Sequence, residues 1–232
     1  MISVENQHDY TAVLAGATGL IGSALLDVLL ADPNCQQVLV ITRQALGRDD
    51  KRIIECLHPH LVFTHEDIDQ LCLAPTSGFI ALGTTLKQAG SKQCLANVDV
   101  HLVNSVADRM KQANIQRLSV VSSYGAARKS LSYYLQCKGL MEEYIQALEF
   151  DHTAIFRPGP LAGERQPPRT SEVITAAILN VINPVMIGQL RNLRLIDAHT
   201  VARAMWLANQ SHLGLQILDN RAMEKLVAGA DR

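Results

Sequence analysis

The sequence predicts a doubly wound α/β fold, in which a parallel sheet carries helices on both faces. Apolar segments of strand length alternate along the chain with longer segments of helical periodicity. A glycine-rich turn at residues 16–22, GATGLIG, joins the first apolar strand to an apolar helix. A second strand at residues 37–41 follows at the distance of a βαβ unit, which makes the two strands parallel.

The three glycines of this turn have the spacing of a dinucleotide site. Gly16 permits the sharp turn, Gly19 lets the backbone approach a pyrophosphate, and Gly22 lets the helix pack close to the strand. The helix N-terminus adds free N–H groups and a partial positive charge. An ordinary strand-to-helix loop is the alternative. The expected cofactor contacts come from the turn and the first helical positions: Gly16, Thr18, Gly19, Leu20 and Ile21.

Composition favours one domain and a small-molecule partner. The 232 residues are 48% hydrophobic, enough for one large core and too few for two comfortable domains. We expect a single domain over residues 1–232, with a cofactor part at about 10–158 and a substrate-side part at about 159–232. Because the net charge is -1, no broad cationic field is available, and we expect neither nucleic acid nor membrane as a partner.

The expected location is the cytosol. No apolar run reaches the length of a membrane span, and the first residues lack a basic segment followed by an apolar one. The five cysteines are odd in number and form no Cys-x-x-Cys pair, which favours reduced thiols over a disulfide framework or a zinc site. The histidines have no ligand spacing beyond His58 and His60, where the intervening proline favours a turn, so no metal is expected.

Hydrophobic periodicity and turn residues predict the other elements. Strands are expected at residues 10–15, 37–41, 61–63, 78–82, 117–121 and 152–156, with a last short one at 216–218. Helices are expected at 20–31, 97–113, 131–148, 172–181, around 200–206 and at 220–227. Residues 49–56 are expected to be helical or looped, and residues 87–92 and 165–170 to form loops.

Residues after the second, third and fourth strands are expected to select and seat the cofactor. Arg43 follows the second strand, where an acid would bind ribose hydroxyls and an arginine pairs with a 2′-phosphate. Since no acid lies closer than Asp49, the sequence favours NADPH or NADP over NAD, with a solvated arginine as the alternative. Asp67 either accepts from the adenine amine or caps the next helix. The fourth strand ends in residues expected to let ribose and pyrophosphate lie against backbone: Leu82, Gly83 and Thr84.

A tyrosine and a lysine four residues apart are the predicted centre of the chemistry. On a helix, Tyr134 and Lys138 share one face. A free phenol, with a pKa of about 10, is a poor acid or base at neutral pH, and a nearby ammonium stabilises its phenolate. Ser122 or Ser123, at the end of the fifth strand, would hold the substrate oxygen beside the phenol, and we take Ser123 as the predicted residue. The alternative is that Tyr134 belongs to a buried helical stripe.

Five motifs in combination make the chain similar to a known superfamily: residues 16–19 (GATG), 82–85 (LGTT), 122–123 (SS), 134–139 (YLQCKG) and 156–159 (FRPG). They resemble the atypical short-chain dehydrogenases/reductases, a group with a Rossmann fold. The extensions at residues 87–90 and 163–166 are similar to the Tat-interacting-protein oxidoreductases, and the likeness runs from about Thr11 to Lys225. The resemblance implies NADPH binding, Tyr134 as the acid-base residue, Lys138 on the nicotinamide ribose, and Arg157 and Pro158 near the nicotinamide. It implies no substrate.

The leading functional hypothesis is an NADPH-dependent oxidoreductase acting on a small carbonyl or alcohol. One alternative is a regulatory protein that binds NADPH without turnover, and the other is a nucleotide-sugar epimerase or dehydratase. The Ser-Tyr-Lys set favours chemistry over sensing, and the short segment after Gly159 leaves little room for a nucleotide sugar. A homodimer through helices 97–113 and 131–148 is the expected assembly.

Overall fold

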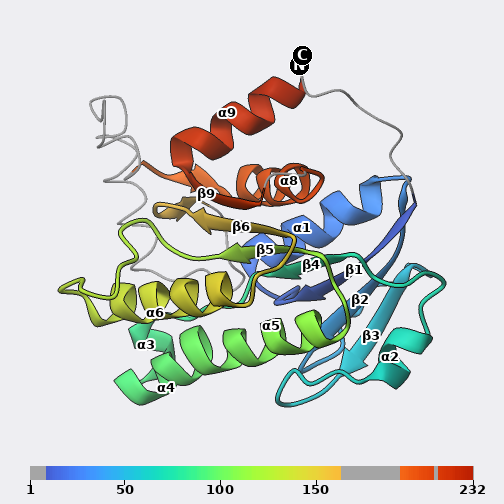
Figure 1. Ribbon diagram of the computed structural model, residues 1–232, viewed down its shortest axis with the longest axis horizontal. Helices are drawn as coiled ribbons and strands as arrows, with labels where there is room; N and C mark the ends of the chain where they lie inside the picture. Colours follow the sequence, from blue (N-terminus) through green and yellow to red (C-terminus); the bar gives the residue numbers. More distant parts are fainter. Residues whose placement is uncertain (1–8, 163–193, 212–213, 232) are drawn as a thin grey trace.

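The computed structural model describes residues 9–162, 194–211 and 214–231, and a parallel sheet runs through the middle of this part (Figure 1). Its seven described strands have the order β3-β2-β1-β4-β5-β6-β9. They are β1 (Tyr10–Ala15), β2 (Cys35–Thr42), β3 (Ile53–Leu57), β4 (Ser77–Ile80), β5 (Arg117–Val121), β6 (His152–Arg157) and β9 (Leu215–Asp219). The strand order reverses direction between β1 and β4, so the predicted doubly wound fold is confirmed.

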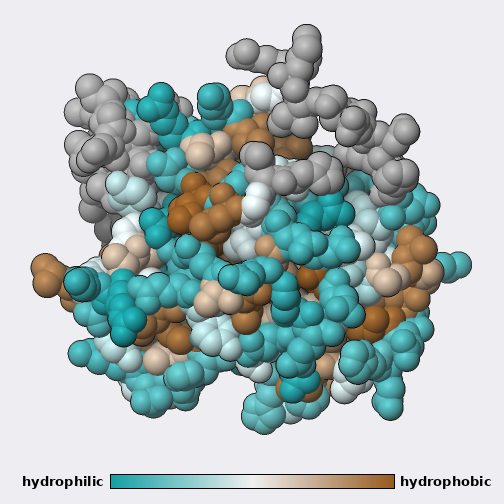
Figure 2. All heavy atoms as spheres, viewed as in Figure 1, coloured by the Kyte–Doolittle hydropathy of each residue, from teal (hydrophilic) through white to brown (hydrophobic). Residues whose placement is uncertain are grey.

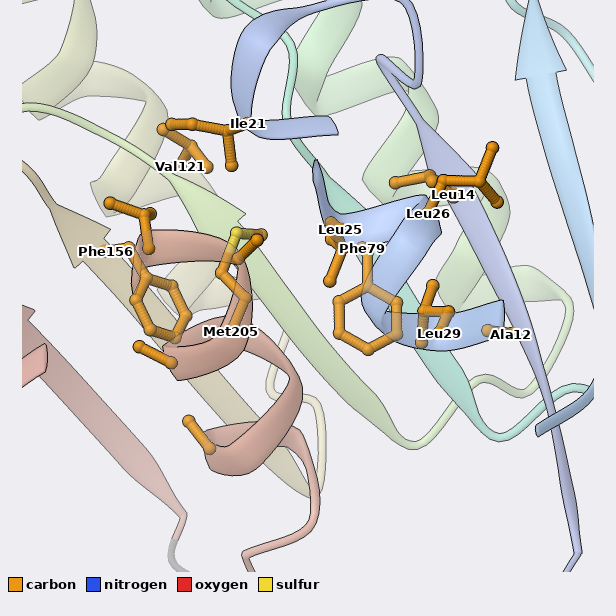
Figure 3. Close-up of a cluster of buried hydrophobic side chains, with 14 of the residues drawn as sticks. Ala12, Leu14, Ile21, Leu25, Leu26, Leu29, Phe79, Val121, Phe156 and Met205 are labelled. Carbon is orange, nitrogen blue, oxygen red and sulfur yellow. The ribbon is translucent and has the colours of Figure 1, made fainter. Parts of the chain in front are cut away.

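Helices cover both faces of the sheet (Figure 1). On one face lie α1 (Leu20–Ala31), α8 (Ala198–Asn209) and α9 (Asn220–Ala230), which share a buried apolar cluster with the strands. On the other face α5 (Val103–Gln112) and α6 (Tyr133–Ala147) form a second cluster. Figure 3 shows the first cluster, where Phe156 lies beside Met205 of α8 and Phe79 lies beside Leu25 and Leu29 of α1.

The third strand of the chain is β3, and residues 61–63 form no strand. Leu61 has a φ of 52°, in the left-handed region, which an extended strand cannot contain. The segment expected to be helical or looped instead supplies β3, which pairs with β2 from Val38↔Ile53 to Thr42↔Leu57. The short helix α2 (His65–Asp69) follows residues 61–63.

Residues 87–92, expected as a loop, belong largely to two short helices, α3 (Leu86–Ala89) and α4 (Lys92–Ala96). Side chains cap both helices, because the Thr85 hydroxyl accepts from the N–H of Gln88 and the Ser91 hydroxyl accepts from the N–H of Cys94. A hydroxyl that accepts from the N–H three residues later is an N-cap, and such a cap favours a helix at each of these two places.

The predicted helix at 97–113 begins with a π-helical turn, η1 (Asn97–Leu102), and continues as α5. The wider turn shifts which positions face the core. Val98 and Leu102 are only half-buried, and Asp99 is buried in line with Val103 of α5. A carboxylate therefore lies on the apolar side of this helix.

The substrate-side part is described only in pieces. The predicted loop at 165–170 and helix at 172–181 lie outside the described residues. Two short strands, β7 (Leu161–Ala162) and β8 (Ile196–Asp197), pair in parallel on either side of that gap.

No helix in the described ranges has the length and apolar character needed to cross a bilayer. All five cysteines are free thiols, and the same ranges contain no group of three side chains suited to bind a metal.

A buried polar cluster ties β1 to α8 at the amino end of the sheet. The Tyr10 hydroxyl donates to Asp32 Oδ2 at 2.9 Å, and the indole N–H of Trp206 donates to the same oxygen at 3.0 Å. Burial, followed by the nearby Cys35 and then Asp32, raises the pKa of Tyr10 well above its ordinary value. Burial likewise raises the pKa of the neighbouring Cys35 thiol to about 12. This cluster lies far from the carboxyl ends of the strands and stabilises the fold.

Candidate functional site

The carboxyl ends of the parallel strands meet at one edge, and the predicted site residues follow them there. Gly16 follows β1 with a φ of 97°, and a Cβ on it would lie 2.7 Å from the backbone of Ala81, just after β4. Only glycine fits this position. A Cβ on Gly22 would lie 2.0 Å from the carbonyl oxygen of Gly16, so the predicted close packing of α1 against the turn is present.

The start of α1 fits a phosphate group. Gly19 is the N-cap residue, no side chain caps this end of α1, and the first turn holds no acidic residue. The N–H groups of the first turn therefore remain available for an anion, with the helix dipole behind them. Thr18 is exposed beside this turn, Leu20 is half-buried, and Ile21 is buried.

The loop after β2 carries two arginines with different surroundings. Arg43 is exposed directly after the strand, at the position predicted to read the 2′-phosphate. Arg48 reaches back to α1, where its guanidinium pairs with Asp27 and donates to the Ser23 hydroxyl at 3.0 Å. Arg48 thus fastens the loop to α1, and binding of a 2′-phosphate by the exposed Arg43 stays a prediction.

Asp67 serves as a helix cap. Its Oδ2 accepts from the N–H of Thr64 at 2.7 Å and from the Thr64 hydroxyl at 3.0 Å, completing a capping box at the start of α2. Of the two roles left open by the sequence, capping is the one that the contacts display. Adenine binding by Asp67 stays a prediction.

Backbone hydrogen bonds order the loop from β5 to α6, which contains Ser123, and tie it to the first turn of α6, which contains Tyr134. The carbonyl of Ser123 accepts from the N–H of Ala126, and the next N–H, of Ala127, donates to the carbonyl of Leu135 at 3.1 Å. A Cβ on Gly139 would lie 2.4 Å from the backbone of this loop, so helix and loop pack without room for a side chain.

Burial distinguishes the two serines. Ser122 is 3% exposed, and its Oγ is enclosed, whereas Ser123 and Tyr134 are half-buried. Ser123 is therefore the more exposed of the two serines, and its role in holding the substrate oxygen stays a prediction.

Lys138 is almost fully buried between the ends of β4 and β5. Its Nζ lies 2.6 Å from Asp99 Oδ1 and donates to the carbonyl of Val121, the last residue of β5, at 3.4 Å. A Cβ placed on Gly83 would lie 3.5 Å from the same nitrogen. The other oxygen of Asp99 accepts from the N–H of Thr84 at 3.1 Å. The predicted lysine and the predicted Leu82–Thr84 segment therefore meet at one carboxylate.

Arg157, at the end of β6, is paired with an acid of α6. Its Nε donates to Glu142 Oε1 at 2.9 Å and its Nη2 to Oε2 at 2.5 Å. These bonds raise the pKa of the Arg157 guanidinium above its ordinary value. The buried Pro158 follows, and its carbonyl accepts from the N–H of Tyr124 at 2.9 Å.

A hollow of about 340 Å³ opens beside Arg157, beyond the ends of β5, β6 and β9. Its lining residues are Tyr124, Gly125, Arg157, Ile217 and Asp219. It has a cation, an anion and an apolar side chain in its wall, so a small polar molecule with an apolar part would fit its chemistry.

Two acids at this edge, Asp99 and Glu142, were not predicted. Both had a signal in the sequence, because each lies at helical spacing from buried positions. Asp99 lies four residues before Val103 and seven before Val106, and Glu142 lies four after Lys138. An acid on the buried side of an amphipathic helix indicates a buried cation nearby.

Related proteins include fungal proteins named "Protein FMP52, mitochondrial". The protein of Debaryomyces hansenii is 33% identical over 156 residues, covering 67% of this chain and 69% of the relative. The protein of Aspergillus fumigatus is 30% identical over 210 residues, covering 89% and 87%.

These names overturn the expected cytosolic location, since the relatives are mitochondrial proteins. The expectation depended on two missing features, a secretory leader and a membrane span. Transit peptides of mitochondrial proteins resemble neither, so that reasoning could not exclude a mitochondrion.

Solved structures share the fold. UDP-N-acetylglucosamine 4-epimerase of Methanobrevibacter ruminantium aligns with a TM-score of 0.66 at 14% identity, covering 97% of this chain and 83% of that one. ADP-L-glycero-D-manno-heptose-6-epimerase of Helicobacter pylori aligns with the same TM-score at 14% identity, covering 98% and 84%. At such identities the likeness concerns the fold alone.

The model of the NAD dependent epimerase/dehydratase family matches residues 12–216, from β1 to β9. Its members are NAD-dependent enzymes, which supports a nicotinamide dinucleotide as the cofactor. With this match over most of its length, the chain belongs to the NAD dependent epimerase/dehydratase family.

Proposed function

We propose that this protein is an NADPH-dependent oxidoreductase that interconverts a small carbonyl compound and its alcohol. The observation that supports the proposal most is the buried Lys138 ammonium at the ends of β4 and β5, on the helix that also carries Tyr134. Ser123 lies on the loop that precedes this helix, and the N–H of Ala127 in that loop donates to the carbonyl of Leu135 in the helix. A serine, a phenol and an ammonium of this kind suit proton transfer to a carbonyl oxygen.

Residues at the carboxyl edge would hold the cofactor. The open N-terminus of α1 would take the pyrophosphate, and the exposed Arg43 would pair with the 2′-phosphate that distinguishes NADPH. Gly83, exposed above the Lys138 ammonium, would let the ribose lie against backbone. The preference for NADPH over NADH follows from Arg43 alone.

In the proposed reduction the bound cofactor supplies a hydride to the carbonyl carbon. The Tyr134 hydroxyl gives its proton to the substrate oxygen, and Ser123 holds that oxygen by a hydrogen bond. The Lys138 ammonium stabilises the phenolate that remains. In the oxidation direction, the phenolate accepts the proton of the alcohol.

A nucleotide-sugar epimerase or dehydratase is the second candidate, favoured by the family match and by the epimerases among the similar structures. The narrower likeness to the Tat-interacting-protein oxidoreductases, at residues 83–85 with 87–90 and at 156–159 with 163–166, favours the first candidate. A regulatory protein that binds NADPH without turnover is the third.

Cofactor titration followed by a substrate screen separates these functions. Binding is measured first, by the change in NADPH and NADH fluorescence. Oxidation of NADPH by any member of a carbonyl panel supports the reductase. Isomerisation of a nucleotide sugar without net cofactor consumption supports the epimerase, and tight binding without either reaction supports the regulator.

We also propose a homodimer through α5 and α6. Leu140 and Tyr144 of α6 are each 39% exposed, which is high for apolar side chains of that size. Elsewhere, the face drawn in Figure 2 is mostly hydrophilic, with hydrophobic residues in separate patches. Light scattering at micromolar concentration should give twice the chain mass, and Leu140→Asp should give the single mass. A monomeric unmutated protein would overturn this assembly.

A further inference from the structure

We propose that Asp99 is a positioning residue, which holds the Lys138 ammonium in place beneath the cofactor-binding edge. The inference rests on the proposed function, because Lys138 is taken to serve the cofactor and Tyr134. Asp99 itself lies under the edge, fully buried, and is expected to touch neither cofactor nor substrate.

Both side chains of the Lys138–Asp99 ion pair are buried. The exposed fraction of the side chain is 2% for Lys138 and 0% for Asp99, and the Nζ to Oδ1 distance is 2.6 Å. Taking an ammonium out of water is costly unless an anion lies beside it. Asp99 supplies that anion, so the lysine can remain charged in a position where the field of its charge is poorly screened.

The same carboxylate orients the end of β4. Oδ2 accepts from the N–H of Thr84, and a Cβ on Gly83 would lie 3.4 Å from Oδ1. Asp99 thus binds both the Lys138 ammonium and the backbone on which the ribose is proposed to lie. It fixes the position of one relative to the other. Asp99 is the buried residue of the π-helical turn η1, and π turns occur frequently at functional sites.

One donor of Lys138 remains for a ligand. An ammonium has three N–H groups, and within the described ranges they meet two acceptors, Asp99 Oδ1 and the carbonyl of Val121. The exposed Gly83 lies next to the nitrogen, so the third group is placed to meet a ribose hydroxyl at this edge.

A double-mutant cycle tests whether Asp99 acts through Lys138. Asp99→Asn keeps the size of the side chain and an acceptor for the Thr84 N–H, and it removes the charge. In the otherwise unmutated protein it should lower the melting temperature by several degrees, because it leaves a buried ammonium without its anion. In the Lys138→Met background it should raise the melting temperature, because it removes a buried carboxylate that has lost its cation. The opposite signs of these two changes in melting temperature can be measured without any cofactor.

Cofactor binding is the second readout of the cycle. Asp99→Asn should weaken NADPH about tenfold in the unmutated background and have no further effect in the Lys138→Met background. Equal weakening in both backgrounds would show that Asp99 does not act through Lys138 and would overturn the proposal. Asp108→Asn is the matched control, since this carboxylate accepts from the Tyr144 hydroxyl on the surface, away from the site. It should leave NADPH affinity unchanged.

The cycle separates this proposal from the proposed function. If the unmutated protein binds neither NADPH nor NADH, the proposed function fails, and the role of Asp99 toward the cofactor fails with it. If the unmutated protein binds NADPH and the melting temperatures combine additively, the proposed function stands, and the role of Asp99 alone is overturned.

Discussion

Arg157 and Glu142 form a two-bond ion pair that joins β6 to α6. The family resemblance implies that Arg157 lies near the nicotinamide, and the structure shows that two of its guanidinium donors go to the Glu142 carboxylate. The Glu142 side chain is 3% exposed and that of Arg157 is 30% exposed, and Arg157 also lines the hollow beside the site. Through it, the helix that carries Tyr134 is fastened to the sheet edge.

Glu142→Gln should destabilise the fold by about 1–2 kcal/mol, because a charge-assisted bidentate pair is replaced by weaker neutral bonds. For a chain of this size, that corresponds to a fall of about 3–6 °C in melting temperature. Glu143→Gln is a matched control on the adjacent residue, whose carboxylate pairs with Arg128 on the exposed surface. Calorimetry that finds the same small change for both variants would remove the structural role assigned to Glu142.

The stability of the protein should fall as the pH rises above 9. The folded state raises the pKa of the buried Cys35 thiol from 9.0 to about 12, so it keeps a proton that the unfolded chain releases. The contribution is complete below pH 9 and is lost as the pH approaches 12. The slope from one such group is at most about 1.4 kcal/mol per pH unit. The buried Tyr10 phenol, with its pKa also raised, acts in the same direction.

Denaturant melts between pH 8 and 10.5 measure this slope. Cys35→Ala should flatten it, while Cys72→Ala, which removes an exposed thiol, should not. An unchanged slope in Cys35→Ala would show that this thiol does not titrate between the folded and unfolded states.

Arg43→Asp should abolish or reverse the cofactor preference. We expect NADPH to bind the unmutated protein at least about tenfold more tightly than NADH, a difference of about 1.4 kcal/mol. Arg48→Gln is the control from the same loop, because Arg48 is occupied by Asp27 and Ser23 on α1. It should keep the preference. Equal affinity of the unmutated protein for NADPH and NADH would contradict the role of Arg43.

The fold could be predicted because its signals are local. The glycine turn, the apolar strands and the helix periodicity each depend on a few adjacent residues, and β1, α1 and β5 have the predicted bounds. The third strand could not be located, because residues 61–63 are as apolar as β3, and the left-handed Leu61 depends on a turn that composition does not specify. Residues 53–57 form the strand, and residues 61–63 do not, because residues 53–57 pair with β2. Such pairing depends on contacts between distant parts of the chain.

The roles predicted for the site residues stay predictions, and the contacts that connect those residues could not be predicted. Ser123, Tyr134 and Lys138 carry recognisable chemistry, and the structure brings their elements together. Asp99 was not among the predicted site residues, although it lies at helical spacing from the buried Val103 and Val106. Whether an acid binds a ligand, caps a helix or pairs with a lysine depends on contacts between distant segments, as Asp67 and Asp99 show.

Tyr134→Phe is the variant that tests the proposed chemistry most directly. It removes only the hydroxyl, so the packing of the ring, the fold and the affinity for NADPH should remain nearly unchanged. Turnover should fall by about two to four orders of magnitude, as expected for loss of a positioned general acid. Lys138→Met should reduce both turnover and NADPH affinity, because the ammonium is proposed to serve the phenol and the ribose together.

Tyr133→Phe provides the matched control for this variant. Tyr133 precedes Tyr134 on α6, and its ring lies 5.3 Å from the Lys92 ammonium, a contact that phenylalanine keeps. Its hydroxyl has no part in the proposed proton transfer, so turnover should stay within about twofold of the unmutated value, far from the loss expected for a general acid. Single-turnover measurements with saturating NADPH distinguish a slow chemical step from slow product release. If an active substrate is found and Tyr134→Phe reduces it with near-normal kcat, another group transfers the proton, and the Ser-Tyr-Lys mechanism is wrong.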